Sequence, residues 1–355
     1  MSANDWSGRR VFITGHTGFK GSWLAMWLSQ LGAKVTGYAL PAPTEPSLFE
    51  QAGVAELLHH VEGDVRDLPA LQRAIEEAQP EMIFHLAAQP LVRLSYAIPV
   101  ETYATNVMGT VHLLEAARSA GSVRGVVCIT SDKCYENREW VWPYRESDAM
   151  GGYDPYSSSK GAAELVVSAY RQSYFDAASI GLASVRAGNV IGGGDWAEDR
   201  LVPDIVRALG AGRAPVIRSP ESIRPWQHVL EALGGYLRIA EKLLEGGGKF
   251  ASAWNFGPSD DDTRPVRWIV ERMIRHWGGG DWQEPAVADA PHEARILKLD
   301  CSKARTELGW CPTLNLDQAL SLVIDWHKAV FAGENARETS FAQIAAYRNL
   351  SGKRA

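Results

Sequence analysis

Cysteine is scarce in this chain, and long apolar runs are missing from it. The 355 residues include only Cys128, Cys134, Cys301 and Cys311, without the Cys-x-x-Cys spacing or nearby histidines of a metal site. No apolar run approaches the roughly 18 residues that span a membrane, and the N-terminal MSANDWSGRRVFITG lacks the apolar stretch of a signal peptide. We therefore expect reduced thiols, no metal, no membrane partner and a cytoplasmic location.

Positive charge is not in excess either. The net charge is −6, the pI is near 5.9 and no polybasic patch occurs, which argues against a nucleic-acid partner. A local basic pocket for a small anionic ligand is still compatible with this net charge. The hydrophobic share of 46% is ordinary for a globular protein, and the length suggests one large or two coupled domains.

Strand-like and helix-like segments alternate through most of the chain. Apolar strand candidates lie at residues 9–15, 33–40, 57–65, 81–88, 125–131, 181–190 and 252–257. Helical spacing marks residues 21–32, 68–78, 99–120 and 158–174 between them. This order predicts an α/β fold in which helices cover both faces of a doubly wound, parallel Rossmann sheet.

The alternation breaks after Asn189 and returns near Val229. We therefore predict a smaller, non-contiguous α+β substrate domain from residues 189–228 plus 259–330. The dinucleotide-binding domain then takes residues 1–188 plus 229–258, and residues 331–355 form a C-terminal helix and tail. A ligand is expected in the crevice between the two domains.

A loop of sequence TGHTGFKG, residues 14–21, joins the first predicted strand to the first helix. Its glycines permit a tight turn and let the backbone approach a pyrophosphate, whose charge the helix N-terminus favours. A plain strand-to-helix turn could also use three glycines, but the position at the start of a βαβ pattern predicts dinucleotide binding. The loop residues assigned to the cofactor are Gly15, Thr17, Gly18, Phe19, Lys20 and Gly21.

The second predicted strand does not decide between NAD and NADP. It ends in YAL, with Ala39 where an acidic residue would bind the adenosine ribose 2′-OH, and no arginine lies beside it. Asp64 and Val65 in EGDVRD are placed for the adenine, with a surface turn as the alternative interpretation.

Tyr156 and Lys160 lie one helical turn apart in YDPYSSSKGAAELV, where Pro155 suits a first helical turn. An ammonium in that position is expected to lower the pKa of the tyrosine, so that it can take a proton from a substrate hydroxyl. By itself the pair is also compatible with a solvated helix face.

Five motifs occur in a fixed order: the glycine loop, HLAAQ at 85–89, Asn106 in NVMGT, ITSDKCY at 129–135 and YSSSK at 156–160. In this order they resemble the extended short-chain dehydrogenase/reductase family over nearly the whole chain. The resemblance implies NAD as cofactor and a hydride-transfer centre that Asn106 helps to complete. The centre consists of Ser131, Tyr156 and Lys160, and Leu86, Ala87 and Ala88 line the cofactor.

Four longer segments, at residues 11–28, 131–165, 186–204 and 224–233, resemble the nucleotide-sugar 4,6-dehydratases of that family, in the branch that acts on CDP-glucose. The resemblance implies a lyase that converts CDP-D-glucose to CDP-4-dehydro-6-deoxy-D-glucose and water. Hydride would move from C4 to C6 of the sugar through bound NAD. The product would supply deoxysugars for a bacterial surface polysaccharide such as the O-antigen of lipopolysaccharide.

Such a dehydration needs an acid and a base near C5 and C6 of the sugar. Asp132 and Lys133 follow Ser131 at the end of a predicted strand, where active sites of doubly wound folds gather. The resemblance assigns the aspartate as the acid. Relatives that act on dTDP-glucose have a glutamate base at the next position, whereas this chain has Lys133, so the identity of the base is left open. The alternative interpretation of Asp132 and Lys133 is an ordinary ion pair at the end of a strand.

Substrate contacts are expected mainly from the second domain. Arg224 in RPWQHV suits a pyrophosphate because a guanidinium matches phosphate oxygens bidentately, and Asn189 lies at the domain junction. The further candidates, each of which could equally be a loop or surface residue, are Gln89, Arg93, Arg200 and His292.

Other functions stay open at this point. A nucleotide-sugar 4-epimerase or reductase needs Tyr156, Lys160 and NAD but not the Asp132–Lys133 pair, and a dehydratase could act on another nucleotide-glucose. A non-catalytic NAD-binding sensor or scaffold is the non-enzyme alternative. Helices near residues 101–119 and 156–175 could pair between subunits as in family members, giving a homodimer or homotetramer.

Overall fold

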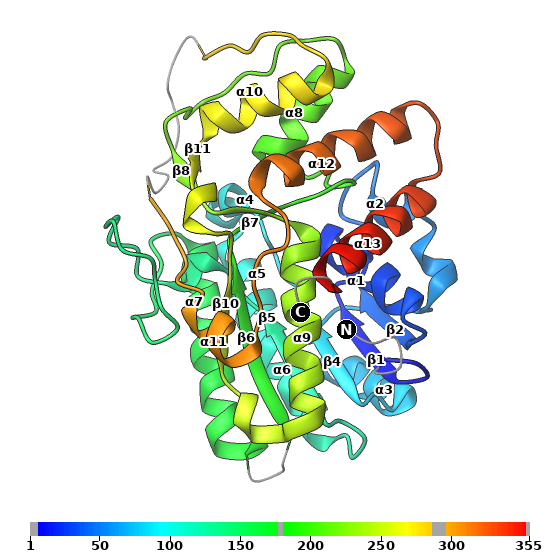
Figure 1. Cartoon of the computed structure of the whole chain (residues 1–355). Helices are drawn as coiled ribbons and strands as arrows, with labels where there is room; N and C mark the ends of the chain where they lie inside the picture. Colours follow the sequence, from blue (N-terminus) through cyan, green and yellow to red (C-terminus); the bar gives the residue numbers. More distant parts are fainter. Residues whose placement is uncertain (1–5, 177–179, 286–295, 353–355) are drawn as a thin grey trace.

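A seven-stranded parallel sheet forms the centre of the protein, as the computed structural model shows (Figure 1). The structure describes residues 6–176, 180–285 and 296–352. The strand order is β3-β2-β1-β4-β5-β6-β10, so the predicted strands and the doubly wound α/β fold are confirmed. The strands are β1 (Arg10–Thr14), β2 (Lys34–Ala39), β3 (His59–Glu62), β4 (Met82–His85), β5 (Gly125–Ile129), β6 (Gly181–Ala187) and β10 (Ala253–Phe256).

Helices cover both faces of this sheet because its strands are apolar on both sides. Along β1, Val11 and Ile13 join the hydrophobic cluster on one face, while Phe12 between them joins the cluster on the other. The first face carries α1 (Phe19–Gln30) and α9 (Val229–Gly246), and the second carries α3 (Leu68–Ala78), α6 (Gly109–Ser119) and α7 (Pro155–Tyr170).

The C-terminal helix α13 (Ala336–Gly352) packs on α1 and confirms the predicted terminal helix. Trp27 of α1 meets Tyr347 of α13 in an edge-on ring contact, with 5.6 Å between ring centroids. Helix α1 is therefore covered by the sheet on one side and by α13 on the other, which is why its residues from Gly21 to Leu28 are all buried.

A second lobe lies above the carboxyl ends of the strands in Figure 1. Its helices α8 (Leu201–Gly210), α10 (Val266–Trp277) and α12 (Leu316–Phe331) share a hydrophobic cluster of their own. Two short sheets accompany them, β7 (Asn189–Ile191) with β9 (Trp226–His228), and β8 (Ile223–Arg224) with β11 (Arg264–Pro265). The lobe is thus non-contiguous in sequence, while the predicted domain boundaries stay a prediction.

The predicted helix at residues 99–120 is interrupted. Helix α5 (Pro99–Tyr103) passes through a π-helical turn, η3 (Ala104–Met108), before α6 begins at Gly109. Such turns displace the helix register and often occur at functional sites, and this one contains the predicted site residue Asn106.

The remaining short elements are α2 (Leu48–Gln51), η2 (Val54–Leu57), α4 (Val92–Ala97), η4 (Asp132–Cys134), η5 (Arg171–Phe175), η6 (Gly247–Phe250), η7 (Asp260–Asp262) and α11 (Ser302–Leu308).

The strand order reverses between β1 and β4, which opens a crevice at their carboxyl ends. The glycine loop follows β1 there and packs against the loop that follows β4. Gly15 has a positive φ of 78°, and a Cβ atom on it would lie 2.7 Å from the backbone nitrogen of Ala87. Both the backbone conformation and the lack of space therefore exclude a side chain at this position.

Within the described ranges, no helix has the length and apolar character needed to cross a membrane.

Gly21 and Gly18 provide a matched pair of substitutions in the glycine loop. A Cβ atom on Gly21 would collide with the carbonyl oxygen of Gly15, whereas one on Gly18 would come no closer than 3.5 Å to its nearest neighbour. We expect Gly21→Ala to lower the free energy of unfolding by about 2 kcal/mol, and Gly18→Ala to cost less than about 1 kcal/mol. Urea unfolding of both variants checks this, and equal losses would contradict the loop geometry.

Candidate active site

Tyr156 and Lys160 lie buried near the start of α7, one helical turn apart. The Asp154 side chain caps this helix by accepting a hydrogen bond from the Ser157 backbone nitrogen at 2.9 Å, and Pro155 takes the first helical position. Ser131, which follows β5, lies close enough to the Tyr156 phenol to lower its pKa. The structure therefore brings together the three residues that the resemblance assigned to one centre.

Burial dominates the electrostatics of this centre. It raises the pKa of Tyr156 to about 12, although the Ser131 hydrogen bond and the Arg200 charge act in the opposite direction. Burial lowers the pKa of Lys160 to about 8, against the opposing effect of Glu164. In the protein alone, the expected lowering of the tyrosine pKa is therefore not seen, because the cost of desolvating a phenolate exceeds the help from its neighbours.

Asp132 has one carboxylate oxygen in use and one without a partner. Its side chain is buried, its Oδ1 accepts a hydrogen bond from the Ser131 hydroxyl at 3.0 Å, and its Oδ2 has no hydrogen-bond partner among the described residues. A buried carboxylate oxygen without a partner is rare in folded proteins and marks a place where a ligand can bind. Lys133 is partly exposed, and it reaches Ser131 through its backbone nitrogen, at 3.2 Å from Oγ.

Two residues of the second lobe, Asp195 and Arg200, add charges near this centre. Arg200, the residue before α8, donates a hydrogen bond to Asp195 Oδ2 at 2.9 Å. Lys20 in the first turn of α1 lies in the same group of charges: burial, Arg200 and Lys160 lower its pKa to about 8, while Asp132 and Asp195 oppose this. Asp195 was not among the predicted site residues, although its place in GGGDW at the domain junction was a usable signal.

The first turn of α1 can hold an anion. Gly18 takes the position before the helix without a side-chain cap, and a Cβ atom there would be 3.5 Å from the Gly15 carbonyl oxygen, an ordinary van der Waals contact. Helix α1 has 12 residues, so its N-terminal backbone N–H groups and dipole favour a negative charge there. The Thr17 hydroxyl donates to the Leu40 carbonyl at 2.9 Å, tying this loop to the end of β2. The residues present therefore fit the pyrophosphate of a dinucleotide.

The region predicted for adenine contains an ion pair and a buried histidine. Asp64 accepts hydrogen bonds from Arg66, which lower the pKa of its carboxyl, and Val65 packs beside Gly109. His16 of the glycine loop contacts His60 of β3, with 2.7 Å between its Nε2 and the Nδ1 of His60, and burial lowers the pKa of His16 to about 3. His16 was not among the predicted cofactor residues.

Asn106 connects the loop after β4 to α7. Its Oδ1 accepts from the Gln89 backbone nitrogen at 2.8 Å, and its Nδ2 donates to the Ser159 hydroxyl at 2.8 Å. The Gln89 side-chain amide donates to the Leu91 carbonyl and to the Thr102 hydroxyl. Gln89 thus uses its donors within the protein, and Asn106 fixes the loop that carries residues 86–88 next to the residue that precedes Lys160.

The predicted substrate residues lie along the junction of the two lobes. Arg93 of α4 reaches Asp199, beside Arg200, at 3.3 Å. Asn189 of β7 pairs with Trp226 of β9, which places it close to Arg224 of the adjoining β8, whose side chain is buried. His292 lies outside the described residues. Arg93 is thus close to Arg200, and Asn189 is close to Arg224, while the roles of all four residues stay predictions.

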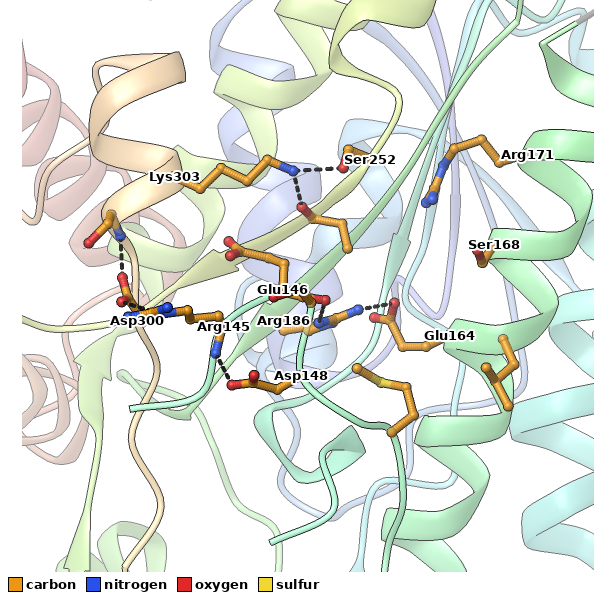
Figure 2. Close-up of a pocket in the computed structure, with 15 residues that line it drawn as sticks. Arg145, Glu146, Asp148, Glu164, Ser168, Arg171, Arg186, Ser252, Asp300 and Lys303 are labelled. Atoms are coloured by element: carbon orange, nitrogen blue, oxygen red, sulfur yellow. Dashed lines mark hydrogen bonds and ion pairs between the residues drawn. The ribbon is translucent and has the colours of Figure 1, made fainter. Parts of the chain in front are cut away.

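A separate cavity of about 690 Å³ lies behind α7 (Figure 2). The predicted site residues are not part of its lining. Instead it is bordered by charged side chains of several elements, including the ion pair of Glu164 with Arg186, whose nearest atoms are 2.7 Å apart, and by Arg171 and Lys303. This cavity therefore adjoins the helix that carries Tyr156 and Lys160 without being the place where these side chains lie.

Comparisons with known proteins agree with this geometry. The family model described as GDP-mannose 4,6 dehydratase matches residues 12–250. The chain is 56% identical to CDP-glucose 4,6-dehydratase of Salmonella typhimurium over 352 residues, which is 98% of each chain.

Solved structures show the same fold. A dTDP-glucose 4,6-dehydratase of Streptomyces venezuelae, solved with NAD bound, has a TM-score of 0.78 at 24% identity and covers 92% of this chain and 98% of its own. A UDP-glucose 4-epimerase of Thermus thermophilus, solved in complex with NAD, has a TM-score of 0.76 at 22% identity over 90% of this chain and 99% of its own. With the family match and the near full-length identity, the predicted resemblance is confirmed: the chain belongs to the GDP-mannose 4,6-dehydratase family.

Proposed function

We propose that the protein is a lyase that converts CDP-D-glucose to CDP-4-dehydro-6-deoxy-D-glucose and water, with NAD as its bound cofactor. The near full-length identity to a CDP-glucose 4,6-dehydratase supports the substrate. The observation that carries the reaction type is the buried Asp132 carboxylate, whose Oδ2 has no partner in the described residues, next to Ser131 and Tyr156. This arrangement adds a proton-transfer group to a hydride-transfer centre.

The residues supply a group for each proton movement. Tyr156 takes the proton of the sugar 4-OH, and Ser131 holds the oxygen of that hydroxyl. Lys160 and Arg200 provide positive charge nearby. A bound NAD would supply the acceptor for the hydride that leaves C4 and the donor that returns it to C6. The ketone at C4 acidifies the C5 hydrogen, Asp132 protonates the departing C6 oxygen, and Lys133 is the group we assign to the C5 proton.

Substrate binding uses the junction between the lobes. Arg224 and Arg200 carry guanidinium groups that suit the diphosphate, and Asn189 lies between the two lobes. In this proposal the pyrophosphate of NAD is held at the first turn of α1, by the glycine loop and the loop that contains Ala87. Both ligands then approach Tyr156 from opposite sides of the crevice.

We propose a cytoplasmic location and a role in supplying deoxysugars for a bacterial surface polysaccharide. The four cysteines are free thiols in the structure, which suits a reducing compartment. A nucleotide-linked 4-keto-6-deoxy sugar is a precursor that further enzymes must reduce or aminate before a glycosyl transfer.

A second copy of the chain is the partner we propose, in a homodimer or homotetramer. Helices α5 and α7 pack side by side, and together with η3 they carry exposed apolar side chains: Val100 is 75% exposed, Leu165 62% and Met108 46%. Exposed apolar groups gathered on neighbouring elements are typical of a protein interface.

The primary test follows a deuterium label from C4 to C6 of the sugar. The protein, supplied with NAD and CDP-glucose that carries deuterium at C4, should give a 4-keto sugar whose new methyl group contains the deuterium, as read by mass spectrometry and proton NMR. Parallel reactions with dTDP-, GDP- and UDP-glucose should give at least tenfold less product. A product with deuterium lost to solvent would contradict the proposed route, and no product from any of the four sugars would favour the non-catalytic alternative.

Replacing Asp132 distinguishes a dehydratase from a 4-epimerase. Asp132→Asn keeps size and hydrogen bonding but cannot give up a proton, so we expect a loss of at least 100-fold in water elimination. Binding of CDP-glucose, measured by calorimetry, should change by less than threefold. Elimination at the normal rate would remove Asp132 from the acid role.

The proposed subunit interface predicts a change in molecular mass. The double substitution Val100→Glu with Met108→Glu places charges on the exposed apolar surface of α5 and η3 and should give monomers. Val216→Glu, at an apolar side chain of the second lobe whose 55% exposure lies between those of Met108 and Val100, is the control and should leave the assembly unchanged. Sedimentation velocity reads the mass, and a monomeric wild-type protein would contradict the proposal.

A further inference from the structure

Glu164 is a buried carboxylate of α7, one helical turn beyond Lys160. It accepts hydrogen bonds from the hydroxyl of Thr130, from the hydroxyl of Ser184 at 2.7 Å and from Nη2 of Arg186 at 2.7 Å. These donors belong to the end of β5 and to β6. One carboxylate therefore joins the helix that carries Lys160 to the two strands beneath it.

Thr130 links this network to the candidate active site on both of its sides. Before it in sequence lies Ile129, whose carbonyl oxygen accepts a hydrogen bond from Lys160 Nζ at 3.4 Å. After it lies Ser131, which donates a hydrogen bond to Asp132 Oδ1 and lowers the pKa of Tyr156. By holding Thr130, Glu164 fixes the backbone that positions Lys160 and the serine.

Arg186 extends the network away from the active site. Its Nη1 donates to the Tyr135 hydroxyl at 2.6 Å, and that hydroxyl donates to Asn255 Oδ1 at 2.8 Å on β10. Figure 2 shows Glu164 and Arg186 joined at the wall of the cavity behind α7. Burial opposes ionisation of Glu164, but Arg186 and the hydrogen bonds outweigh it and lower the pKa of this carboxyl. Glu164 is therefore an anion at neutral pH.

The titratable groups that face Lys160 come from five elements, and Glu164 is the anion among them. They are Glu164 on α7, Cys128 on β5, Cys134 on η4, His85 on β4 and Lys20 on α1. Burial raises the pKa of both thiols and lowers that of His85 to about 3, so these three groups are neutral at pH 7. Lys20 is a cation and opposes the charge of Lys160. In this part of the described structure, Glu164 thus supplies the negative charge that offsets the burial of the lysine.

We propose that Glu164 is a positioning residue for the reaction: through Thr130 it holds the end of β5, and through its charge it keeps the buried Lys160 protonated during turnover. The inference rests on the proposed role of Lys160 beside Tyr156. It distinguishes Glu164 from a purely structural ion pair, because a structural pair would affect folding without affecting the protonation of the lysine.

The test separates the charge of Glu164 from its hydrogen bonds. Glu164→Gln keeps the shape but removes the charge, Glu164→Asp keeps the charge, and Thr130→Val removes one hydrogen bond while leaving the carboxylate ionised. Glu164 lies one helical turn from Lys160 on α7, and a neighbouring opposite charge shifts a pKa by about 1–3 units, so removing it should lower the pKa of Lys160 by at least about one unit. Activity that needs the ammonium form is then lost at a lower pH.

Two readouts follow this shift. The alkaline limb of the kcat profile with CDP-glucose should move down by at least about one pH unit in Glu164→Gln and stay in place in Glu164→Asp and Thr130→Val. Independently of turnover, NMR titration of protein labelled at lysine Cε and Nζ should show the same shift of the Lys160 signal. A Lys160→Met variant identifies that signal.

Several outcomes would overturn the proposal. An unchanged Lys160 titration in Glu164→Gln refutes it even if activity falls, and a shift of equal size in Thr130→Val would assign the effect to structure. If Glu164→Gln fails to fold because Arg186 is left unpaired, the double variant Glu164→Gln with Arg186→Met removes both charges and should still show the downward shift. A wild-type protein without turnover would count against the proposed function, while the NMR titration would still decide the role of Glu164.

Discussion

Burial of charge at the carboxyl ends of β1 and β5 is the constraint on which the rest of the site depends. Tyr156, Lys160 and Asp132 are held away from water and Lys20 partly so, and in each pKa that shifts strongly here desolvation is the largest cause. A carboxylate and several cations in one dry region are costly unless their charges offset each other. Hydrogen bonds from elements far apart in sequence offset part of this desolvation cost.

The arrangement needs both lobes. The sheet supplies Ser131 and Asp132 at the end of β5, while the second lobe supplies Asp195 and Arg200 at the start of α8. Each lobe has its own hydrophobic cluster, so each can keep its half of the site rigid. A ligand at the junction would therefore meet groups that are fixed before it binds, which lowers the cost of ordering them.

The cavity behind α7 shows that a sizeable cavity need not be the place of a protein's chemistry. Its lining contains as many acidic as basic side chains around the Glu164–Arg186 pair. Ser131 and Tyr156 lie outside that lining, and next to them is the buried Asp132 carboxylate, whose Oδ2 has no hydrogen-bond partner among the described residues. Unsatisfied polar atoms such as Asp132 Oδ2 indicate a reactive site more directly than empty volume does.

The parallel sheet could be predicted from the sequence, because each strand is a short apolar run and each connection a helix, and so could the glycine loop and the spacing of Tyr156 and Lys160. Folding was needed to reveal the π-helical turn around Asn106, the engagement of Gln89 within its own loop, the approach of Arg200 to Tyr156, and the group of charges that Lys20 forms with Asp132 and Asp195. Glu164 stood in the sequence four residues after Lys160, but its partners Thr130, Ser184 and Arg186 lie on strands that only folding brings to it. The physical reason is that local patterns record hydrogen bonding and apolar periodicity along the chain, whereas burial, and with it the charge of each buried group, is a property of all the elements packed together.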